Sequence, residues 1–432
     1  MGKINNYDFG GGGNNRVKNP LQLADNELTQ SQNAELIPDE AKGGEGALSK
    51  RGGLSALTTA LAGAISGLGT LPLQTTYTRY LYVSLQNADA DRFLSSTDGT
   101  TFVATSSPLL AMDEDAYGGG IKAGGLRMGT FGKALYYPGD DISASLGPAL
   151  QSWDGTNAFT VGRIPTGPSS DGTACLSIGD VLVANGKVYF TVFDPPASTP
   201  NARGRVLSFN PNTGQMKQIC EAFGTAPFMT AGQPISLAFY NGQLWAGLDD
   251  RAAGAGKVVR CYPDVDETWT VDTAALDGPV YSLESYRGNL YAAQFKGGAN
   301  ALISVRTAST GLWTTSYTGS AVANAYIKGL TVFNDELYAV EHATTPLVHV
   351  KKFDGSSWTT DRDMDSSDGA VAGNFPEGLL VFNSALFVAV RATTSSAADG
   401  FVMKRTTAGV WSKIVAAENI GGYLGELVTR SS

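Results

Sequence analysis

The stretch that decides the fold spans residues 327–342 and reads IKGLTVFNDELYAVEH. A mostly apolar run ends at Phe333, the dipeptide Asn334-Asp335 follows, and a second run begins at Glu336. Asn and Asp tolerate the positive φ that a two-residue hairpin turn requires. In the second run, side chains alternate with the period of a β-strand, because Leu337 and Ala339 fall on one face and Tyr338 and Val340 on the other. The stretch therefore predicts two antiparallel strands joined by a tight turn.

The pair Leu337-Tyr338 has counterparts along most of the chain, and we call the aromatic member of each pair its first landmark. The seven pairs are Leu81-Tyr82, Leu135-Tyr136, Val188-Tyr189, Leu244-Trp245, Leu290-Tyr291, Leu337-Tyr338 and Leu386-Phe387. After a second turn, each pair is followed by another large apolar residue, which we call the second landmark. The second landmarks are Phe102, Phe159, Met216, Trp269, Trp313, Trp358 and Trp411. The separation between the two landmarks varies only from 20 residues (Tyr338 to Trp358) to 27 residues (Tyr189 to Met216). We interpret the repeated aromatic residues as packing between neighbouring units.

Each repeated unit accommodates about four strands, one before and one after each of its two turns. A four-stranded sheet repeated about every 40–50 residues is typical of a propeller blade. We therefore predict an all-β fold, a seven-bladed β-propeller over residues 75–432. No counterpart of residues 327–333 precedes Leu81-Tyr82, whereas such a segment is left over at residues 422–428. We expect this C-terminal strand to complete the first blade and close the ring.

The composition of the 432 residues agrees with short strands and tight turns. Charged residues make up 16% of the chain, against about 25% in average domains, and there are 53 glycines. The net charge of −9 argues against general nucleic-acid binding, which needs clustered Lys and Arg. The three cysteines, Cys175, Cys220 and Cys261, argue against a disulfide framework and indicate a reducing cytosol. No signal peptide is expected, and the apolar stretch 54–73 is too interrupted by Ser, Thr, Gly and Pro to predict a membrane span.

The sequence offers few residues for chemistry. His342 and His349 bracket a predicted hairpin and are interpreted as surface strand histidines, since no Ser-His-Asp arrangement or phosphate-binding loop accompanies them. Alternate carboxylates at Asp361, Asp363 and Asp365 raise a calcium hypothesis. Ser366 stands where a calcium loop would have glycine and a closing Glu is missing, so a polar loop is the preferred interpretation. The prediction is no catalytic residue, no cofactor and no metal.

Residues 1–74 are predicted to form an extended N-terminal arm. It is rich in Gly and Asn and includes a short helix from Asp25 to about Leu36, with Asp25 as its N-cap. Such an arm cannot bury its own apolar side chains, so we expect it to order against a partner. The partner-contacting residues would be Leu21, Leu23, Leu28, Leu36 and Ile37.

The arm resembles the N-terminal segment of tailed-bacteriophage virion proteins that precedes a β-propeller body. The resemblance covers Asn19-Pro20-Leu21-Gln22-Leu23, Glu27-Leu28, Gln32-Asn33-Ala34 and 46–54, which contains Lys50-Arg51-Gly52-Gly53. It implies a non-enzymatic structural component of the tail nozzle, hub or neck.

In that interpretation the chain would form a homo-oligomeric, hexameric ring and bind tail, portal or adaptor proteins. DNA would pass through without specific binding, and no membrane would be contacted. The protein would be synthesised in the host cytoplasm and reside in the virion. Three alternatives stay open: a carbohydrate-binding propeller acting in adsorption or decoration, a polysaccharide hydrolase or lyase, and a bacterial surface or scaffold protein.

Overall fold

The structure is a computed structural model. It describes residues 34–39, 45–50, 79–86, 92–104, 128–131, 134–139, 149–155, 157–163, 177–194, 203–219, 233–250, 255–263, 266–294, 300–320, 325–343, 348–366, 368, 370, 375–391, 400–416 and 423–431. The chain divides into two compact units, Met1–Tyr77 and Thr78–Ser432.

The described part of the first unit is an antiparallel hairpin. It consists of β1 (Ala34–Asp39) and β2 (Glu45–Lys50), with Ala34 opposite Lys50. Leu36 and Ile37 therefore lie in a strand, and the prediction that a helix extends to Leu36 is wrong. Pro38 supplies a physical reason, because the residue before a proline is biased toward extended backbone. The rest of the predicted helix, together with Leu21, Leu23 and Leu28, lies outside the described residues.

The described part of the second unit contains seven four-stranded antiparallel sheets, which confirms the predicted all-β propeller. Blade 1 is β30 (Tyr423–Ser431), β3 (Arg79–Gln86), β4 (Arg92–Ser96) and β5 (Val103–Ala104). Blade 2 is β6 (Gly129–Phe131), β7 (Ala134–Gly139), β8 (Ala149–Trp153) and β9 (Ala158–Arg163). Blade 3 is β10 (Ser177–Ala184), β11 (Lys187–Asp194), β12 (Arg203–Asn210) and β13 (Gln215–Gln218).

The other four blades continue in the same order. Blade 4 is β14 (Gln233–Tyr240), β15 (Gln243–Asp250), β16 (Ala255–Tyr262) and β17 (Asp266–Leu276). Blade 5 is β18 (Val280–Tyr286), β19 (Asn289–Gln294), β20 (Leu302–Arg306) and β21 (Trp313–Thr318). Blade 6 is β22 (Tyr326–Phe333), β23 (Glu336–His342), β24 (Val348–Phe353) and β25 (Trp358–Met364). Blade 7 is β26 (Phe375–Phe382), β27 (Ala385–Arg391), β28 (Phe401–Arg405) and β29 (Trp411–Ala416).

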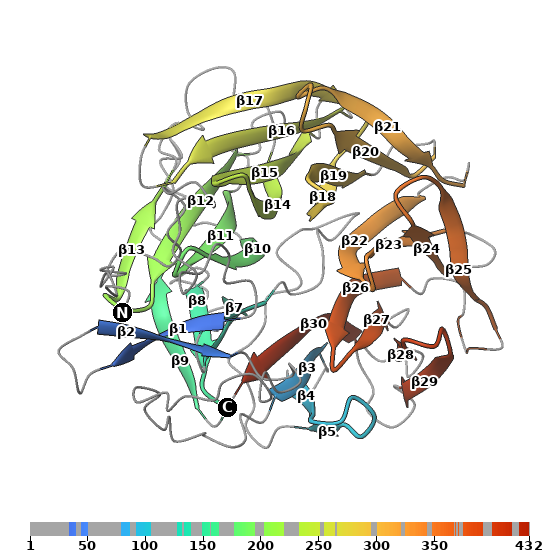
Figure 1. Ribbon diagram of the computed structural model, residues 1–432, viewed down its shortest axis with the longest axis horizontal. Helices are drawn as coiled ribbons and strands as arrows, with labels where there is room; N and C mark the ends of the chain where they lie inside the picture. The colour runs from blue at the N-terminus through green and yellow to red at the C-terminus, as the bar shows by residue number, and fades with distance from the viewer. Residues whose placement is uncertain are drawn as a thin grey trace, which may run out of the picture. The chain divides into compact units, whose positions relative to one another are not determined.

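The seven sheets stand around a common axis. The first strand of each blade contacts the first strands of its two neighbours, in the closed order β30, β6, β10, β14, β18, β22, β26 and back to β30. Figure 1 shows the labelled first strands, β10, β14, β18, β22, β26 and β30, nearest the centre of the ring, while the fourth strands, such as β17, β21 and β25, form its outer wall.

The ring is closed by the last strand of the chain. β30 pairs with β3 in blade 1, where Val428 lies opposite Tyr82. The prediction that the C-terminal segment completes the first blade is confirmed. Blade 1 therefore combines strands from both ends of the second unit.

The predicted hairpin turns have the backbone conformation that their residues suggested. Positive φ values occur at Asn185, Asn241, Arg287, Asn334, Asp335, Asn383 and Ser384. These dipeptides join the first two strands of blades 3 to 7, so the turn residues fix the strand register.

The landmark residues lie between blades, as interpreted from the sequence. All seven first landmarks are buried. Tyr189 of blade 3 shares a cluster with Leu244 and Trp269 of blade 4, and Tyr338 of blade 6 shares one with Leu386 of blade 7. The apolar core of the propeller is therefore divided among the joints between sheets.

Two backbone amides on inner strands are bound by the preceding blade. Asp180 Oδ2 accepts a hydrogen bond from the amide of Leu237 at 2.6 Å, and Ser282 Oγ accepts one from the amide of Leu330 at 3.1 Å. Asp180 and Ser282 each lie beside a register shift in their inner strand. The bulges thus allow short polar side chains to reach the next blade.

In the part of the chain that the structure describes, no helix is long and apolar enough to span a lipid bilayer. The interrupted apolar stretch 54–73 falls outside that part.

Candidate functional site

The outer strands of blades 4 and 5 are joined by a buried ionic cluster, which we call the Asp272 lock. Asp272 on β17 accepts hydrogen bonds from Arg306 Nε at 2.7 Å and from Trp313 Nε1 at 2.8 Å. Arg306 Nη2 donates to the other carboxylate oxygen at 3.2 Å, and Arg260 Nε lies 3.0 Å from that oxygen. The Arg306 guanidinium also lies 5.1 Å from the ring centroid of Trp245. The lock thus ties two strands of blade 5 to blade 4.

The same arrangement recurs between blades 6 and 7. Asp361 on β25 accepts hydrogen bonds from Arg405 Nε at 2.6 Å and Trp411 Nε1 at 2.8 Å, and Lys352 Nζ lies 3.7 Å away. Arg405 lies over the ring of Tyr338 at 5.4 Å, as Arg306 lies over Trp245. Every member of this second cluster occupies the strand position of its counterpart in the Asp272 lock.

The acceptor position lies three residues after the second landmark, and blades 3, 5 and 7 fill it differently. In blade 5 it is Ser316, whose Oγ accepts a hydrogen bond from Trp358 Nε1 at 3.0 Å. In blades 3 and 7 it is Ile219 and Ile414, which pack near Trp269 and Phe102. Where the acceptor is an aspartate, the next blade supplies a basic donor, Arg306 or Arg405. Where the acceptor is serine, the same position of the next blade is Phe353. The residue types at a joint therefore change together.

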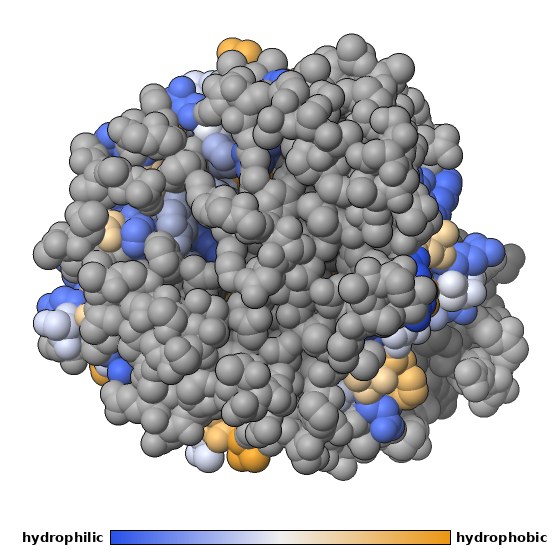
Figure 2. All heavy atoms as spheres, turned by 180° about the vertical axis from the view of Figure 1, so that it is seen from behind, coloured by the Kyte–Doolittle hydropathy of each residue, from blue (hydrophilic) through white to orange (hydrophobic). Residues whose placement is uncertain are grey.

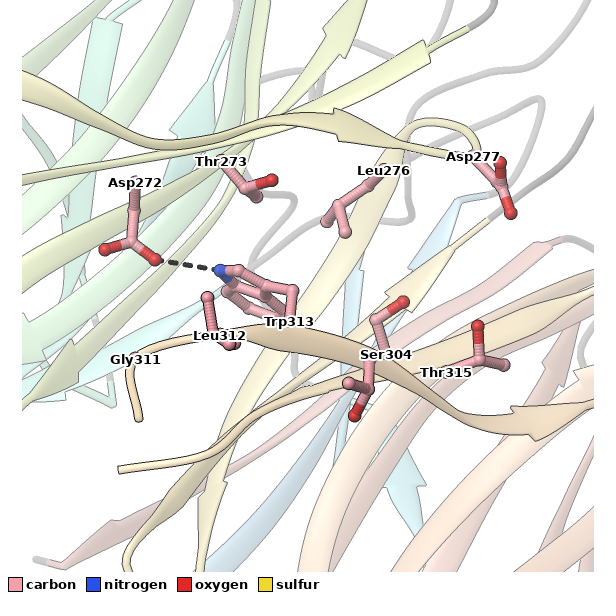
Figure 3. A pocket seen from close by; sticks show the side chains of 10 residues that line it. Asp272, Thr273, Leu276, Asp277, Ser304, Gly311, Leu312, Trp313 and Thr315 are labelled. Carbon is pink, nitrogen blue, oxygen red and sulfur yellow. Dashed lines mark hydrogen bonds between the residues drawn. The ribbon is translucent and has the colours of Figure 1, made fainter. Parts of the chain in front are cut away.

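A pocket of about 320 Å³ opens beside the Asp272 lock, between β17 of blade 4 and β20 and β21 of blade 5 (Figure 3). Its lining residues are Asp272, Thr273, Leu276, Asp277, Ser304, Gly311, Leu312, Trp313, Thr314 and Thr315. Figure 3 shows the Trp313 indole beneath β17, with its nitrogen directed at Asp272. The size lies at the lower end of the range for small-molecule sites, roughly 300–1,000 Å³.

The pocket exists because β17 does not pair evenly with β16. Three register shifts interrupt this pairing, and Leu276 returns to the ladder opposite Gly256. A β-carbon on Gly256 would lie 1.8 Å from the carbonyl oxygen of Gly278, so only glycine permits this close approach. The irregular course of β17 carries Leu276 and Asp277 over the edge of blade 5, where they form one wall of the pocket.

The wall on β20 contributes a buried hydroxyl. Ser304 is 6% exposed, and its Oγ accepts a hydrogen bond from Nε2 of the fully buried Gln294 at 2.5 Å. A serine hydroxyl can accept and donate at once. Ser304 is thus held by Gln294 where it lines the pocket.

The rim of the pocket has a carboxylate and an exposed aliphatic side chain. Asp277 is exposed, and Leu312 is 66% exposed next to the partly buried Trp313. On the described surface, large exposed apolar residues are spread over six blades: Val103, Phe159, Tyr262, Leu312, Val332 and Val410. Figure 2 accordingly shows hydrophobic colour in separate small groups on the face that it presents. The pocket is therefore distinguished by its shape and polar groups.

The two histidines differ from their predicted setting. Both are buried, and cross-strand pairing places His342 opposite Val348 and His349 opposite Glu341, so the two rings belong to opposite faces of blade 6. His342 stacks on Tyr326 with ring centroids 5.1 Å apart, and His349 Nδ1 lies 2.5 Å from Asp363 Oδ1. The interpretation as surface histidines was wrong because the neighbouring blades cover both faces of the blade 6 sheet.

The three calcium candidates do not form one site. Asp361 accepts hydrogen bonds from Arg405 in the second ionic cluster, and Asp363 faces His349. The backbone carbonyl of Asp365 accepts hydrogen bonds from the amides of residues 368 and 370. In the part of the chain that the structure describes, no group of three or more His, Cys, Asp or Glu side chains is arranged to hold a metal ion.

Other aspartates act as turn formers. The carboxylate of Asp98 accepts hydrogen bonds from the amides of Thr101 and Thr100, which hold the pKa of Asp98 well below its usual value. The amide of Ser357 and the hydroxyl of Ser356 similarly lower the pKa of Asp354 to about 2. Their hydrogen bonds are local, so these residues stabilise turns.

The joint between blades 5 and 6 holds two further carboxylates. Glu341 is completely buried and accepts hydrogen bonds from Tyr317 Oη at 2.9 Å and from the amide of Ser320 at 2.7 Å. Burial next to Glu341 raises the pKa of Tyr317 far above its ordinary value. On the inner strand β18, burial raises the pKa of Glu284 to about 7, although a hydrogen bond from the Ser285 amide opposes this shift.

Sequence reasoning missed the pocket and the locks. A signal for the locks was present, because aligning the blades on their second landmarks places Asp272, Ser316 and Asp361 in one column. The pocket had no comparable signal, since it depends on the register shifts of β17.

No family model matches the chain, and no curated protein matches it. Among solved structures, the chain is similar to a puromycin hydrolase mutant complexed with PGG, with a TM-score of 0.53 and 12% identity over 78% of this chain and 52% of that one. It is also similar to a puromycin-hydrolyzing peptidase of Mycobacterium tuberculosis, with a TM-score of 0.52 and 10% identity over 79% and 52%. A prolyl endopeptidase has a lower TM-score of 0.43, with 14% identity over 66% of this chain and 42% of that one. The chain thus spans about half the length of the solved structures it matches, and the likeness shows the propeller fold.

These comparisons contradict the resemblance to phage virion proteins. The similar solved structures are peptidases, so the predictions of a structural phage component, of a virion location and of a non-enzymatic role are wrong. The error has a physical origin. A propeller is a scaffold that serves unrelated functions, so architecture plus a short arm motif did not determine the role. Self-association of the chain and partner contacts of the arm stay predictions.

Proposed function

We propose that this chain acts in peptide hydrolysis as a peptide-binding propeller that works with a catalytic body, meaning a domain or subunit that carries the nucleophile and its base. The observation that carries the proposal is the likeness of its blades to the propellers of two peptidases, over about half the length of those proteins. A propeller of this size supplies a rigid surface with loops and joints that can hold a peptide. The pocket beside the Asp272 lock gives that surface a defined binding site.

The catalytic step is assigned to residues outside the described propeller. Peptide hydrolysis by covalent catalysis requires a nucleophile, a base and a group that orients the base. The described ranges contain a base with an orienting carboxylate, His349 with Asp363, but the His349 side chain is only 11% exposed in the joint between blades 5 and 6. We therefore assign this pair to the packing of the joint, and recognition of the peptide to the propeller.

The proposal is tested with the full-length protein and a mixture of unmodified peptides of eight to twelve residues. Cleavage is followed by mass spectrometry, and binding of the same peptides is measured separately by calorimetry. We expect sequence-dependent peptide binding, with cleavage when the catalytic body is present. A protein that neither binds nor cleaves any member of the mixture would refute the proposal.

A further inference from the structure

Glu284 is a carboxyl group near the centre of the ring that has no counter-ion among the described residues. It lies on β18, the inner strand of blade 5 (Figure 1). Its side chain is partly exposed, and its hydrogen-bond partner in the described part of the chain is the amide of the adjacent Ser285, at 3.0 Å. Burial without a compensating charge raises the pKa of Glu284 to about 7. The group is therefore crowded by the protein yet open to a ligand on one side.

The fold does not require a carboxyl group at this position. Strand pairing aligns Glu284 with a neutral residue on the inner strands of blades 3, 4, 6 and 7, namely Leu182, Ala238, Thr331 and Leu380. A crowded carboxylate without a counter-ion costs stability, so a neutral side chain would serve packing better. Ionisable groups whose pKa is shifted by burial are typical of binding and catalytic sites.

The surroundings of Glu284 supply no positive charge to it. Cross-strand pairing places Glu284 opposite Tyr291, which packs with Leu330 of blade 6, so both lie on the side of β18 that faces this blade. The other titratable groups on β18, the following turn, β19 and β22 are Tyr281, Tyr286, Arg287, Tyr291, Tyr326 and Lys328. The pKa of Glu284 is set by burial and by the Ser285 hydrogen bond, with no contribution from the charge of any of these groups. A cationic ligand would thus be the first positive charge beside this carboxylate.

We propose that Glu284 binds a cationic amine of a peptide, either the α-ammonium group or the side chain of a lysine. The inference rests on the proposed peptide-binding function and names the charge that the propeller recognises. An ammonium group offers three hydrogen-bond donors, and its bond to a carboxylate is strengthened by the opposite charges. A metal ion is disfavoured, because in the described part of the chain no group of three or more His, Cys, Asp or Glu side chains is arranged to hold one.

The experiment uses the full-length protein and three peptides: Gly-Gly-Gly-amide with a free amino terminus, its acetylated form, and acetyl-Gly-Lys-Gly-amide. Dissociation constants are measured by calorimetry at pH 7 and pH 5.5 for the parent protein, Glu284→Gln and Glu284→Leu. Asp154→Asn is the matched control, because Asp154 is exposed in a turn of blade 2, where an amide oxygen can still accept the hydrogen bond of Asn157. Thermal melting of each variant establishes that it is folded, and the pH dependence of the parent needs no variant.

We expect the two peptides with a free amine to bind the parent at pH 7 about ten to a hundred times more tightly than the acetylated glycine peptide, the effect of one hydrogen bond to a charged group. Both Glu284 variants should lose this preference, and Asp154→Asn should keep it. At pH 5.5 the amines stay charged while Glu284, with its pKa of about 7, is mostly protonated, so their binding to the parent should weaken about tenfold.

The two amine peptides identify the source of the charge. Tighter binding of the lysine peptide would assign the site to a side chain, and tighter binding of the free amino terminus would assign it to the end of a peptide. Equal affinity of the amine and acetylated peptides for the parent, or a preference for amines that persists in both Glu284 variants, would overturn the inference.

Methylammonium chloride separates this inference from the proposed function. Peptides that are bound and cleaved equally well by the parent and by Glu284→Gln would refute the cation site while the proposed function stands. Methylammonium that binds the parent but not Glu284→Gln, with no peptide bound or cleaved, would support the cation site and count against the proposed function.

Discussion

Replacing Asp272 by Ala is the most informative test of how the blades are held together. The side chain of Asp272 is 4% exposed and that of Arg306 is 14% exposed, so the substitution leaves a largely buried guanidinium without its counter-ion. It also removes the acceptor of the Trp313 indole. Breaking a buried ion pair from one side typically costs about 3–5 kcal/mol. Arg260 is 32% exposed and can turn toward water, so we expect a value near the lower limit, about 3 kcal/mol.

The chain itself provides the compensating variant. At the joint of blades 5 and 6, the positions of Asp272, Arg306 and Arg260 are held by Ser316, Phe353 and Val305. The triple variant Asp272→Ser, Arg306→Phe, Arg260→Val copies that joint. Exchanging a buried ionic cluster for packed neutral side chains is often neutral, so we expect the triple variant to unfold within about 1 kcal/mol of the parent.

The assay is urea unfolding followed by circular dichroism. Free energies of unfolding are compared with one common m-value, the slope of the free energy against urea concentration. The control is Asp335→Asn, which removes an exposed ion pair with Arg287 at 2.8 Å, keeps a residue type that tolerates the positive φ of this turn, and should leave the midpoint nearly unchanged. If Asp272→Ala costs less than about 1 kcal/mol, or if the triple variant is as unstable as the single one, the lock does not hold the blades together as described.

Three further predictions concern other parts of the ring. Burial raises the pKa of Glu284 from its ordinary value of 4.5 to about 7, so the folded state binds more protons than the unfolded chain, and the free energy of unfolding should fall by about 2–3 kcal/mol as pH rises from 4.5 through 7. Urea unfolding at a series of pH values measures this slope. The variant Glu284→Leu should abolish it, and leucine already occupies the equivalent positions 182 and 380 on the inner strands of blades 3 and 7. Glu341→Ala should lower the free energy of unfolding by about 3 kcal/mol, because the Tyr317 hydroxyl and the Ser320 amide lose a buried acceptor, and Glu341→Gln should lower it less. Equal stability of the Ala variant and the parent in urea unfolding would contradict this role. Deleting residues 420–432 removes β30 from blade 1 and should abolish the cooperative thermal transition, and a melting temperature within a few degrees of the parent would show that the ring does not need this strand.

The architecture was predictable because the residues that determine it are local and repeated. Asn334-Asp335 fixes a hairpin, Leu337-Tyr338 fixes the faces of the following strand, and seven copies of this pattern leave few alternatives to a propeller. The closing strand followed from a count of segments. Residues 34–36 were predicted wrongly because a helical N-cap at Asp25 was given more weight than the extended preference of the residue before Pro38.

The candidate site was not predictable in the same way. The pocket is lined by residues of two blades, Asp277 after blade 4 and Ser304 and Trp313 in blade 5, and the sequence does not show that they lie close together. The gap between them depends on the irregular pairing of β16 with β17. His342 and His349 were judged exposed because a single hairpin has an open face, whereas each sheet here is covered by its neighbours. The phage role inferred from the resemblance of the arm was wrong because a short motif carries little information about the function that a propeller serves.

The pairing of β30 with β3 has a consequence for the order of events during synthesis. The partners Tyr82 and Val428 are 346 positions apart (428 − 82), so the first blade to leave the ribosome is the last to be finished. For an unstructured chain, closing a loop of that length costs about 5 kcal/mol of entropy, and the cost is smaller once the intervening blades have folded. Blades 2 to 7 can form while translation continues, but the ring stays open until β30 has been synthesised. A ribosome stalled before β30 would therefore display an almost complete propeller with one unpaired strand edge, which is the form that chaperones and proteases would encounter.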